Sequence, residues 1–235
     1  MRIKYAILGI LLVLIDTDAE GSNQLLTKAD SLFRSQKYTE AFSLYQQLAN
    51  EGAASSAMLL KMAFIQDASG DYVDALYYLD LYYQKSADRQ VIGKIEEIAE
   101  EYGLSGYRYN DSHYFAALLS KYKNYILLLL FSFSGALLAY LFIKRRKGIK
   151  SVTPAIFQLI NAILLLLVIN ISSETDGIII NDQTLLRSGP SARAEPLEVL
   201  SKGHKVGVIE RTPVWTKIKW NGEEAYLRNY NLKII

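Results

Sequence analysis

Two long apolar segments, separated by a short basic one, constrain this chain more than any other feature of its sequence. They cover residues 125–143 and 154–171. A helix needs about 20 apolar residues, or roughly 17 at the short end, to cross a bilayer. The loop between them, residues 144–153, carries five positive charges and no acid, and such short basic loops stay on the cytoplasmic side. We therefore expect a transmembrane hairpin with both chain ends on the opposite side.

The first 19 residues are typical of a secretory signal peptide. Arg2 and Lys4 precede an apolar run of about ten residues, too short to span comfortably, and Thr17 to Ala19 offer a small-residue cleavage site. The alternative is an uncleaved membrane anchor. Either way residues 20–123 are expected to be exported, in agreement with the position of the basic loop.

The charge balance and the residue types exclude several functions. The formal net charge is +2, less than the charge of the basic loop alone, so neither outer segment has the basic face that nucleic-acid binding needs. There is no cysteine and there are two histidines, His113 and His204, without a second zinc-type ligand near either in the sequence. Nucleophilic catalysis by Ser or Cys needs a paired base. We therefore expect no catalytic residue, metal or cofactor, and take the paired glutamates at 96–97 and 100–101 as a solvated helix face.

Residues 20–104 contain an internal repeat of 34 residues. The segments KYTEAFSLYQQL and DYVDALYYLDLY align, and the matching pairs are Leu25 with Leu59, Ala29 with Ala63, Tyr38 with Tyr72 and Ala41 with Ala75. This period, with an aromatic residue three before an alanine, resembles the tetratricopeptide repeat. Gly70 can stop a helix before the second aromatic residue, whereas Gln36 occupies the equivalent place in the first repeat. Residues 91–102 predict a capping helix, and 105–124 a juxtamembrane linker.

The resemblance implies a groove lined by the first helix of each repeat. The residues it places there are Leu26, Asp30, Phe33, Leu60, Phe64 and Asp67. Such a mixed apolar and acidic surface suits a peptide or helix of a partner protein. The alternative is that the four apolar members belong to the core.

Small residues at four-residue spacing in the first apolar segment favour close helix packing. In the second segment Asn161 lies level with Ala136, near Ser134 and Gly135, when residues are counted inward from the two cytoplasmic ends. We expect its amide to join the two helices. A transport path is the alternative, but neither segment has the ionisable residue that marks such paths.

After a linker at 172–177, residues 178–235 show short β patterns. The run VWTKIKW alternates Thr216, Ile218 and Trp220 with lysines and is followed by Asn221 and Gly222, the strongest short hairpin signal. The chain therefore predicts a multi-domain membrane protein with α-helical tetratricopeptide-like hairpins, a two-helix transmembrane hairpin and a small all-β SH3-like barrel.

Separated motifs in this last segment occur in a defined order. They are LLRSGPS from Leu185, LSKGHKV from Leu200, WTKI from Trp215, NGEEAYL from Asn221, and the closing Tyr230 and Leu232. The order resembles the bacterial SH3 domain, although Ala225 and Tyr226 replace a usual Gly-Trp pair. The resemblance implies a ligand groove, for which the candidates are Trp215, Trp220, Tyr226 and Tyr230; the alternative is that at least two of them are core. We expect His204 to be an exposed turn residue.

The order of modules resembles the BatE-type proteins of the Bacteroides aerotolerance operon. The resemblance implies a non-enzymatic adaptor in the inner membrane, with both termini periplasmic and with partners in a membrane complex that include von Willebrand-type domain proteins. The alternative is a cell-wall sensor whose SH3-like domain binds peptidoglycan or a peptide. Beyond these partners we expect contact with the lipid bilayer and none with nucleic acid.

Overall fold

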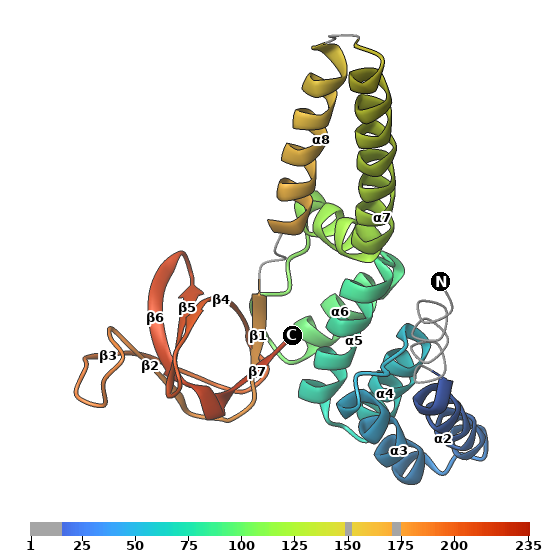
Figure 1. The fold of residues 1–235 in the computed structure, drawn as a ribbon. Coiled ribbons are helices and arrows are strands. Elements are labelled where there is room, and N and C mark those ends of the chain that lie inside the picture. Colours follow the sequence, from blue (N-terminus) through green and yellow to red (C-terminus); the bar gives the residue numbers. More distant parts are fainter. Residues whose placement is uncertain (1–15, 149–151, 171–174) are drawn as a thin grey trace. The chain divides into compact units, whose positions relative to one another are not determined.

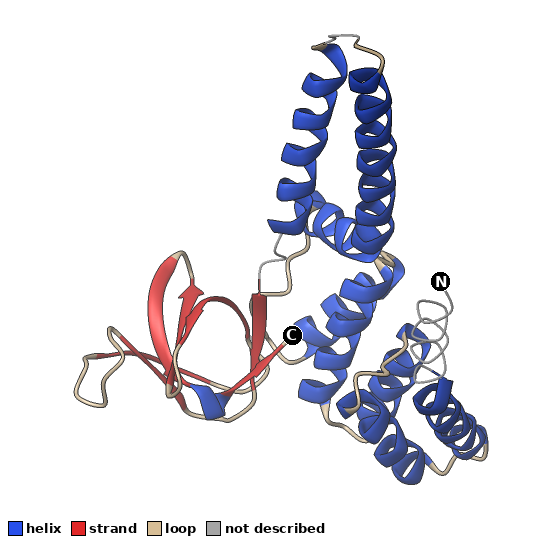
Figure 2. Cartoon of the chain, in the orientation of Figure 1, coloured by secondary structure: helices blue, strands red, loops and turns tan. Residues whose placement is uncertain are grey.

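The computed structural model describes residues 16–148, 152–170 and 175–235 (Figure 1). Helices come first along the chain and strands last (Figure 2). The described chain divides into two compact units with a boundary between Tyr82 and Tyr83. Most of the expected signal segment, part of the basic loop and most of the second linker lie outside the described residues, so the expectations for them stay predictions.

Two helical hairpins build the first unit. The first pairs α2 (Asp16–Arg34) with α3 (Tyr38–Asn50), and the second pairs α4 (Ser56–Ala68) with α5 (Tyr72–Ser86). The start of α4 is fixed by Ser55, whose hydroxyl accepts a hydrogen bond from the backbone N–H of Met58 at 3.2 Å, as a good N-cap does. Each hairpin begins its second helix at one of the two tyrosines that the 34-residue repeat aligns.

The turns inside the two hairpins have the same geometry. In the first, the N–H of Lys37 donates to the carbonyl of Leu32, and in the second the N–H of Asp71 donates to that of Gln66, both at 2.9 Å. These are the long bonds of a Schellman helix end, which requires a left-handed residue just before the donor. Gly70 has φ 82° there and Gln36 has φ 60°. The backbone thus repeats after 34 residues even though the first turn lacks the glycine.

Small side chains allow the helices of the first unit to approach closely. The repeat alanines are all buried, namely Ala29, Ala41, Ala63 and Ala75. Larger apolar side chains complete the core, among them Tyr45, Leu48, Met58, Met62 and Leu76. Because a buried alanine leaves room for the neighbouring backbone, the spacing of the repeat is a packing requirement rather than a surface pattern.

The second unit starts at the end of α5 and continues with α6 (Gln90–Glu101). The capping helix predicted at 91–102 corresponds to α6, and Val91, Ile95, Ile98 and Ala99 are buried along one of its stripes, as in an amphipathic helix. The glutamates at 96–97 and 100–101 lie on its exposed side. They therefore have the solvated placement expected for them.

Helix α7 (Asp111–Arg146) is longer than the sequence led us to expect. Residues 105–124 were predicted as a linker, but α7 includes those from Asp111 onward. The cause is a capping box: the Asn110 side chain accepts the N–H of His113, and His113 Nδ1 accepts the N–H of Asn110. The two bonds satisfy otherwise unpaired donors at the first turn. The helix therefore starts well before the apolar segment and runs continuously into it.

Helix α8 (Thr153–Asn170) packs antiparallel to α7. Two hydrogen bonds fix the direction: Lys123 Nζ donates to the carbonyl of Ile169 at 3.2 Å, and Gln158 Nε2 donates to Ser134 Oγ at 2.7 Å. Figure 1 shows the two helices side by side along most of α8. Helix α7 is long and apolar enough to cross a membrane, and α8 contains a shorter apolar stretch, Ile156–Asn170.

The polar contact inside this hairpin involves a different residue from the one expected. Asn161 is buried, but the amide that bonds Ser134 belongs to Gln158, one turn earlier. Counting inward from the predicted span ends placed Asn161 level with Ala136, near Ser134 and Gly135. The Lys123–Ile169 and Gln158–Ser134 bonds set a different register, in which Ser134 lies level with Gln158, one turn before Asn161.

The strands form one antiparallel sheet in the order β3-β2-β6-β5-β4-β1-β7. The strands are β1 (Thr175–Ile179), β2 (Thr184–Arg187), β3 (Pro196–Leu200), β4 (Lys205–Arg211), β5 (Trp215–Trp220), β6 (Glu223–Arg228) and β7 (Leu232–Ile234), with a 3₁₀ turn, η1 (Asn229–Asn231), before β7. The predicted hairpin is confirmed, because β5 and β6 pair around Asn221 and Gly222, both at positive φ. The first strand begins at Thr175, inside the expected linker, because its first residues already pair with β4.

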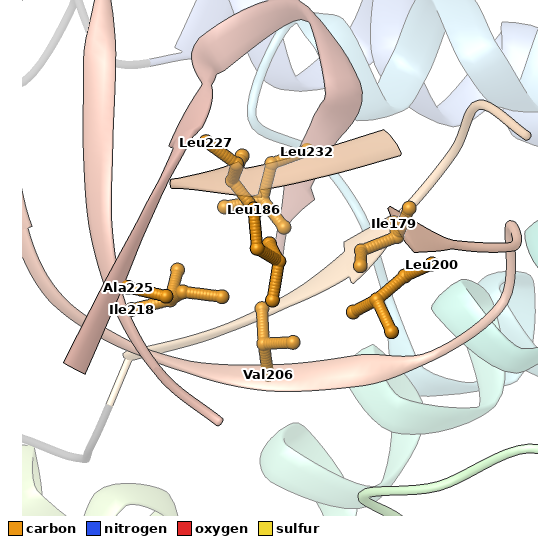
Figure 3. Close-up of a cluster of buried hydrophobic side chains, with 8 residues drawn as sticks. All are labelled: Ile179, Leu186, Leu200, Val206, Ile218, Ala225, Leu227 and Leu232. Atoms are coloured by element: carbon orange, nitrogen blue, oxygen red, sulfur yellow. The ribbon is translucent and has the colours of Figure 1, made fainter. Parts of the chain in front are cut away.

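A small apolar core lies inside this sheet (Figure 3). Its members come from all seven strands and are Ile179, Leu186, Leu200, Val206, Ile218, Ala225, Leu227 and Leu232. On β5 and β6 these residues alternate with outward-facing ones, as the two-residue period of a strand requires. This alternation decides which of the candidate aromatic residues can share a surface.

Candidate functional site

The first candidate surface lies on the helical hairpins. Leu60 and Phe64 are 42% and 51% exposed, so these two side chains are not core. The rings of Phe33, Tyr38 and Phe64 meet edge to face, with centroids 5.5 to 5.8 Å apart. The sequence aligned Tyr38 with Tyr72 as a repeat position and gave no sign of its place in this aromatic cluster. The cluster presents an apolar patch across α2, α3 and α4, which is unusual on a fully solvated surface.

The acidic members of the predicted groove differ from each other. Asp30 Oδ1 accepts hydrogen bonds from Tyr45 Oη at 2.6 Å and from Lys61 Nζ at 2.7 Å, so it ties α2 to α3 and α4. Burial alone would raise the pKa of Asp30, but the bonds from Lys61 and Tyr45 hold it below its ordinary value. Burial and the bond to Asp30 raise the pKa of Tyr45. Asp30 is therefore part of the packing, whereas Asp67 is exposed at the end of α4 and Leu26 is half-buried.

The second candidate surface lies on the sheet, where the four aromatic candidates separate. Trp220 follows Thr216 and Ile218 on the inward side of β5 and packs against the core. Its Nε1 donates to Glu198 at 2.7 Å, and its ring meets His204 edge to face at 5.4 Å. Tyr230 is 68% exposed in η1. These two residues therefore do not face the same surface.

Trp215 and Tyr226 do share a face, on the outer side of β5 and β6, where Trp215 is buried and Tyr226 is half-buried. Trp215 pairs with Arg228 across the strands, and the guanidinium lies 4.3 Å from its ring centroid. Tyr226 pairs with Lys217 on one side and Arg187 on the other. Aromatic rings beside cations can bind a ligand that is both planar and anionic. The structure thus brings together two of the four groove candidates.

His204 is the residue that sequence reasoning placed least well. We expected an exposed turn residue, but the ring is half-buried. Its Nδ1 accepts the backbone N–H of Ser105 at 3.0 Å, and its Nε2 lies 3.2 Å from Ser201 Oγ. Because Nδ1 is an acceptor, the neutral ring carries its proton on Nε2 and donates it to Ser201. Burial lowers the pKa of His204, while the charge of Glu198 partly raises it.

Comparison with known families identifies the strand region. Residues 183–233 match the bacterial SH3 domain. This part of the chain is a bacterial SH3 domain, a module that binds proteins or the cell wall. No curated protein matches the chain. The domain follows a helical region, and within the described residues no group of three His, Cys, Asp or Glu side chains is placed to hold a metal ion.

Proposed function

We propose that this protein is a non-enzymatic adaptor of a bacterial membrane that displays its helical repeats and its SH3 domain on the same, periplasmic side. The observation that carries the proposal is the antiparallel pairing of α7 and α8, fixed by the Lys123–Ile169 and Gln158–Ser134 bonds. The helical region enters this hairpin at the end where the SH3 domain leaves it. The basic residues Lys144, Arg145 and Arg146 lie at the other end of α7, which favours the cytoplasmic side for that end.

The exposed patch around Phe33, Tyr38 and Phe64 supports the adaptor role. A helix or extended segment of a partner protein would cover these rings, and burying aromatic side chains supplies much of the affinity of protein interfaces. The order of modules resembles that of the BatE-type proteins, and we propose partners within a membrane complex of that kind. The SH3 domain would then provide a second attachment point for the same complex.

The topology can be tested by labelling single cysteines, because the chain has none of its own. Glu40→Cys on α3, Lys147→Cys beyond α7 and Glu223→Cys on β6 place thiols at exposed positions. A membrane-impermeant maleimide applied from the periplasmic side should label positions 40 and 223 and should reach 147 after permeabilisation only. Labelling of position 147 together with the other two in intact membranes would refute the hairpin.

The adaptor role needs a separate test. The tagged full-length protein is crosslinked in its native membrane and compared with a chain truncated before Glu174 and with the double variant Leu60→Ala/Phe64→Ala. A control, Phe115→Ala, removes an exposed phenylalanine of α7 outside the patch. The proposal predicts a defined set of membrane proteins that survives truncation and the control and is lost with the double variant. Recovery that is unaffected by the double variant would contradict it.

A cell-wall sensor is the second candidate, favoured by the outer face that carries Trp215, Tyr226 and Arg228. Aromatic rings flanked by cations suit sugar and carboxylate groups of peptidoglycan. In this case purified protein would sediment with isolated cell wall, and binding would be lost with Tyr226→Ala, whose ring lies on that face, but kept with Tyr230→Ala. Retention of full-length protein and both variants alike would argue against this use of the face.

A further inference from the structure

The extended segment between α6 and α7 makes a specific contact with the SH3 domain. We call residues 105–109, with the sequence SGYRY, the strap. We propose that the β1–β4 side of the SH3 domain is a recognition surface whose ligand is this strap, and that the surface binds an extended Ser-Gly-Tyr-x-Tyr segment as a peptide ligand. The inference goes beyond the adaptor role and rests on contacts within the second unit.

Three hydrogen bonds hold the strap, one between backbone groups and two that involve a side chain. The N–H of Ser105 donates to His204 Nδ1, and the carbonyl of Ser105 accepts the N–H of Lys205, each at 3.0 Å. Tyr107 Oη donates to the carbonyl of Gly203 at 2.7 Å. Three consecutive residues of the SH3 domain thus bind two residues of the strap.

Lys205 shows that the surface is built to be covered. Its side chain is only 8% exposed, and its ammonium group pairs with Asp176 at 3.2 Å. The group also lies 4.9 Å from the centre of the Tyr109 ring and 3.4 Å from its hydroxyl. A buried cation is costly unless charges and π systems surround it. The strap supplies the aromatic part of that environment.

The burial of neighbouring residues also indicates that this surface is covered. Ile178 lies opposite Lys205 in the β1–β4 pairing, and so on the same face, and it is 0% exposed although it is outside the barrel core. Tyr107 of the strap is 4% exposed. An outward-facing isoleucine on a small barrel would otherwise be in water. The covered face therefore has the apolar content of an interface rather than of a free surface.

Gly106 gives the surface its sequence requirement. Its φ is +98°, and a Cβ built on it would overlap the carbonyl oxygen of Lys205. A side chain at this position is thus excluded by both backbone conformation and space. Gly103, three residues earlier, also has a positive φ of +64° but has open space around it. The two glycines provide a matched pair for an experiment.

The strap also lies beside Trp220, one of the four aromatic candidates for the ligand groove. Arg108 and Tyr109 of the strap line a hollow of about 190 Å³ together with Trp220 and Asn221 of the barrel. Trp220 in turn contacts His204, which accepts the strap N–H. The strap thus lies next to Trp220, one of the four residues that the sequence predicted for the ligand groove.

The test uses the full chain in detergent and a fluorescein-labelled peptide of residues 102–110. In the wild type and in Gly103→Ala the cis strap, at a high effective concentration, should exclude the peptide. In Gly106→Ala the strap is released, and peptide binding measured by anisotropy should tighten at least roughly tenfold. A peptide carrying alanine in place of Gly106 should not bind. Equal binding to Gly106→Ala and wild type, or equal binding of both peptides, would overturn the proposal.

Hydrogen exchange gives an independent readout on the same proteins. The N–H of Lys205 is protected by Ser105, so Gly106→Ala should speed its exchange, while Gly103→Ala should leave it unchanged. Tyr107→Phe, which removes one hydroxyl without changing shape, should speed it roughly threefold to tenfold. A cooperative unfolding transition in denaturant, followed by the fluorescence of Trp215 and Trp220, verifies that the barrel is folded. Slow exchange of the Lys205 amide in folded Gly106→Ala protein would also overturn the proposal.

Discussion

Gln36 occupies a backbone conformation that suits glycine, and replacing it offers a clear test of the repeat geometry. Its φ is 60°, and the equivalent position in the second repeat is Gly70 with φ 82°. Both turns keep the same Schellman bonds. The side chain of Gln36 is exposed, so its removal should not open a cavity. We expect Gln36→Gly to stabilise the first hairpin and Gly70→Gln to destabilise the second.

The magnitude follows from two opposing terms. A left-handed conformation costs an L-residue about 1–2 kcal/mol. Glycine loses more conformational freedom on folding, which costs roughly 0.5–1 kcal/mol. The difference predicts that Gln36→Gly raises the free energy of unfolding by about 0.5–1 kcal/mol, and that Gly70→Gln lowers it by a similar amount. Asparagine tolerates the left-handed region, so Gln36→Asn should give an intermediate value.

Hydrogen exchange followed by mass spectrometry on the full chain can resolve the two hairpins separately. The amide of Lys37, which donates to Leu32, reports on the first turn, and that of Asp71 on the second. The predicted change corresponds to exchange roughly twofold to fivefold slower in Gln36→Gly. If Gly70→Gln speeds exchange while Gln36→Gly leaves it unchanged or faster, backbone strain at Gln36 is not the controlling term.

Three further predictions concern the interior contacts. Tyr45→Phe removes the hydroxyl that donates to Asp30 and should lower the free energy of unfolding of the first unit by about 1–2 kcal/mol; an unchanged exchange profile would contradict the role of this bond. Leu227→Ala should destabilise the SH3 core by about 2–5 kcal/mol, measured by denaturation with Trp fluorescence, and an unshifted midpoint would refute it. Burial lowers the pKa of His204 below its ordinary value of 6.5, so the neutral ring that accepts the Ser105 N–H is present above pH 6.5 and is lost as the pH falls through the lowered pKa. Exchange of the Ser105 amide, corrected for its intrinsic rate, should therefore accelerate as the pH is lowered below 6.5, and this acceleration should disappear in His204→Gln.

Short sequence patterns predicted the features that depend on neighbouring residues, such as a tight turn or a helix-packing position. The turn at Asn221 and Gly222 requires two positive φ values, and this dipeptide supplies them. The 34-residue shift aligned Ala29 with Ala63 because close helix packing requires a small residue at both places. The start of α7 also has a local signal in the sequence, since Asn110 followed by His113 forms a capping box.

The candidate site was harder to predict because it depends on register and on contacts between distant segments. Trp215 and Trp220 are five positions apart on one strand, so the two-residue period places them on opposite faces. The bond from Ser105 to His204 spans 99 positions, and no periodicity or turn pattern near either residue announces it. The hydrogen bond to Ser134 comes from Gln158 rather than Asn161 for a similar reason, because it depends on how two helices align.

The strap ends one residue before Asn110, the N-cap of α7, while β1 starts at Thr175, shortly after α8. Two contacts therefore bring the same two parts of the chain together. One is the docking of the strap on the SH3 domain, and the other is the pairing of α7 with α8. Closing a loop costs entropy that grows slowly with its length, and when one closure is already in place the second requires little more. Docking of the SH3 domain and pairing of α7 with α8 are thus linked equilibria, and by reciprocity each strengthens the other by the same factor. A partner that releases the strap from the SH3 domain would therefore weaken the pairing of α7 with α8, and in the proposed topology this would carry a binding event at the SH3 domain into the membrane.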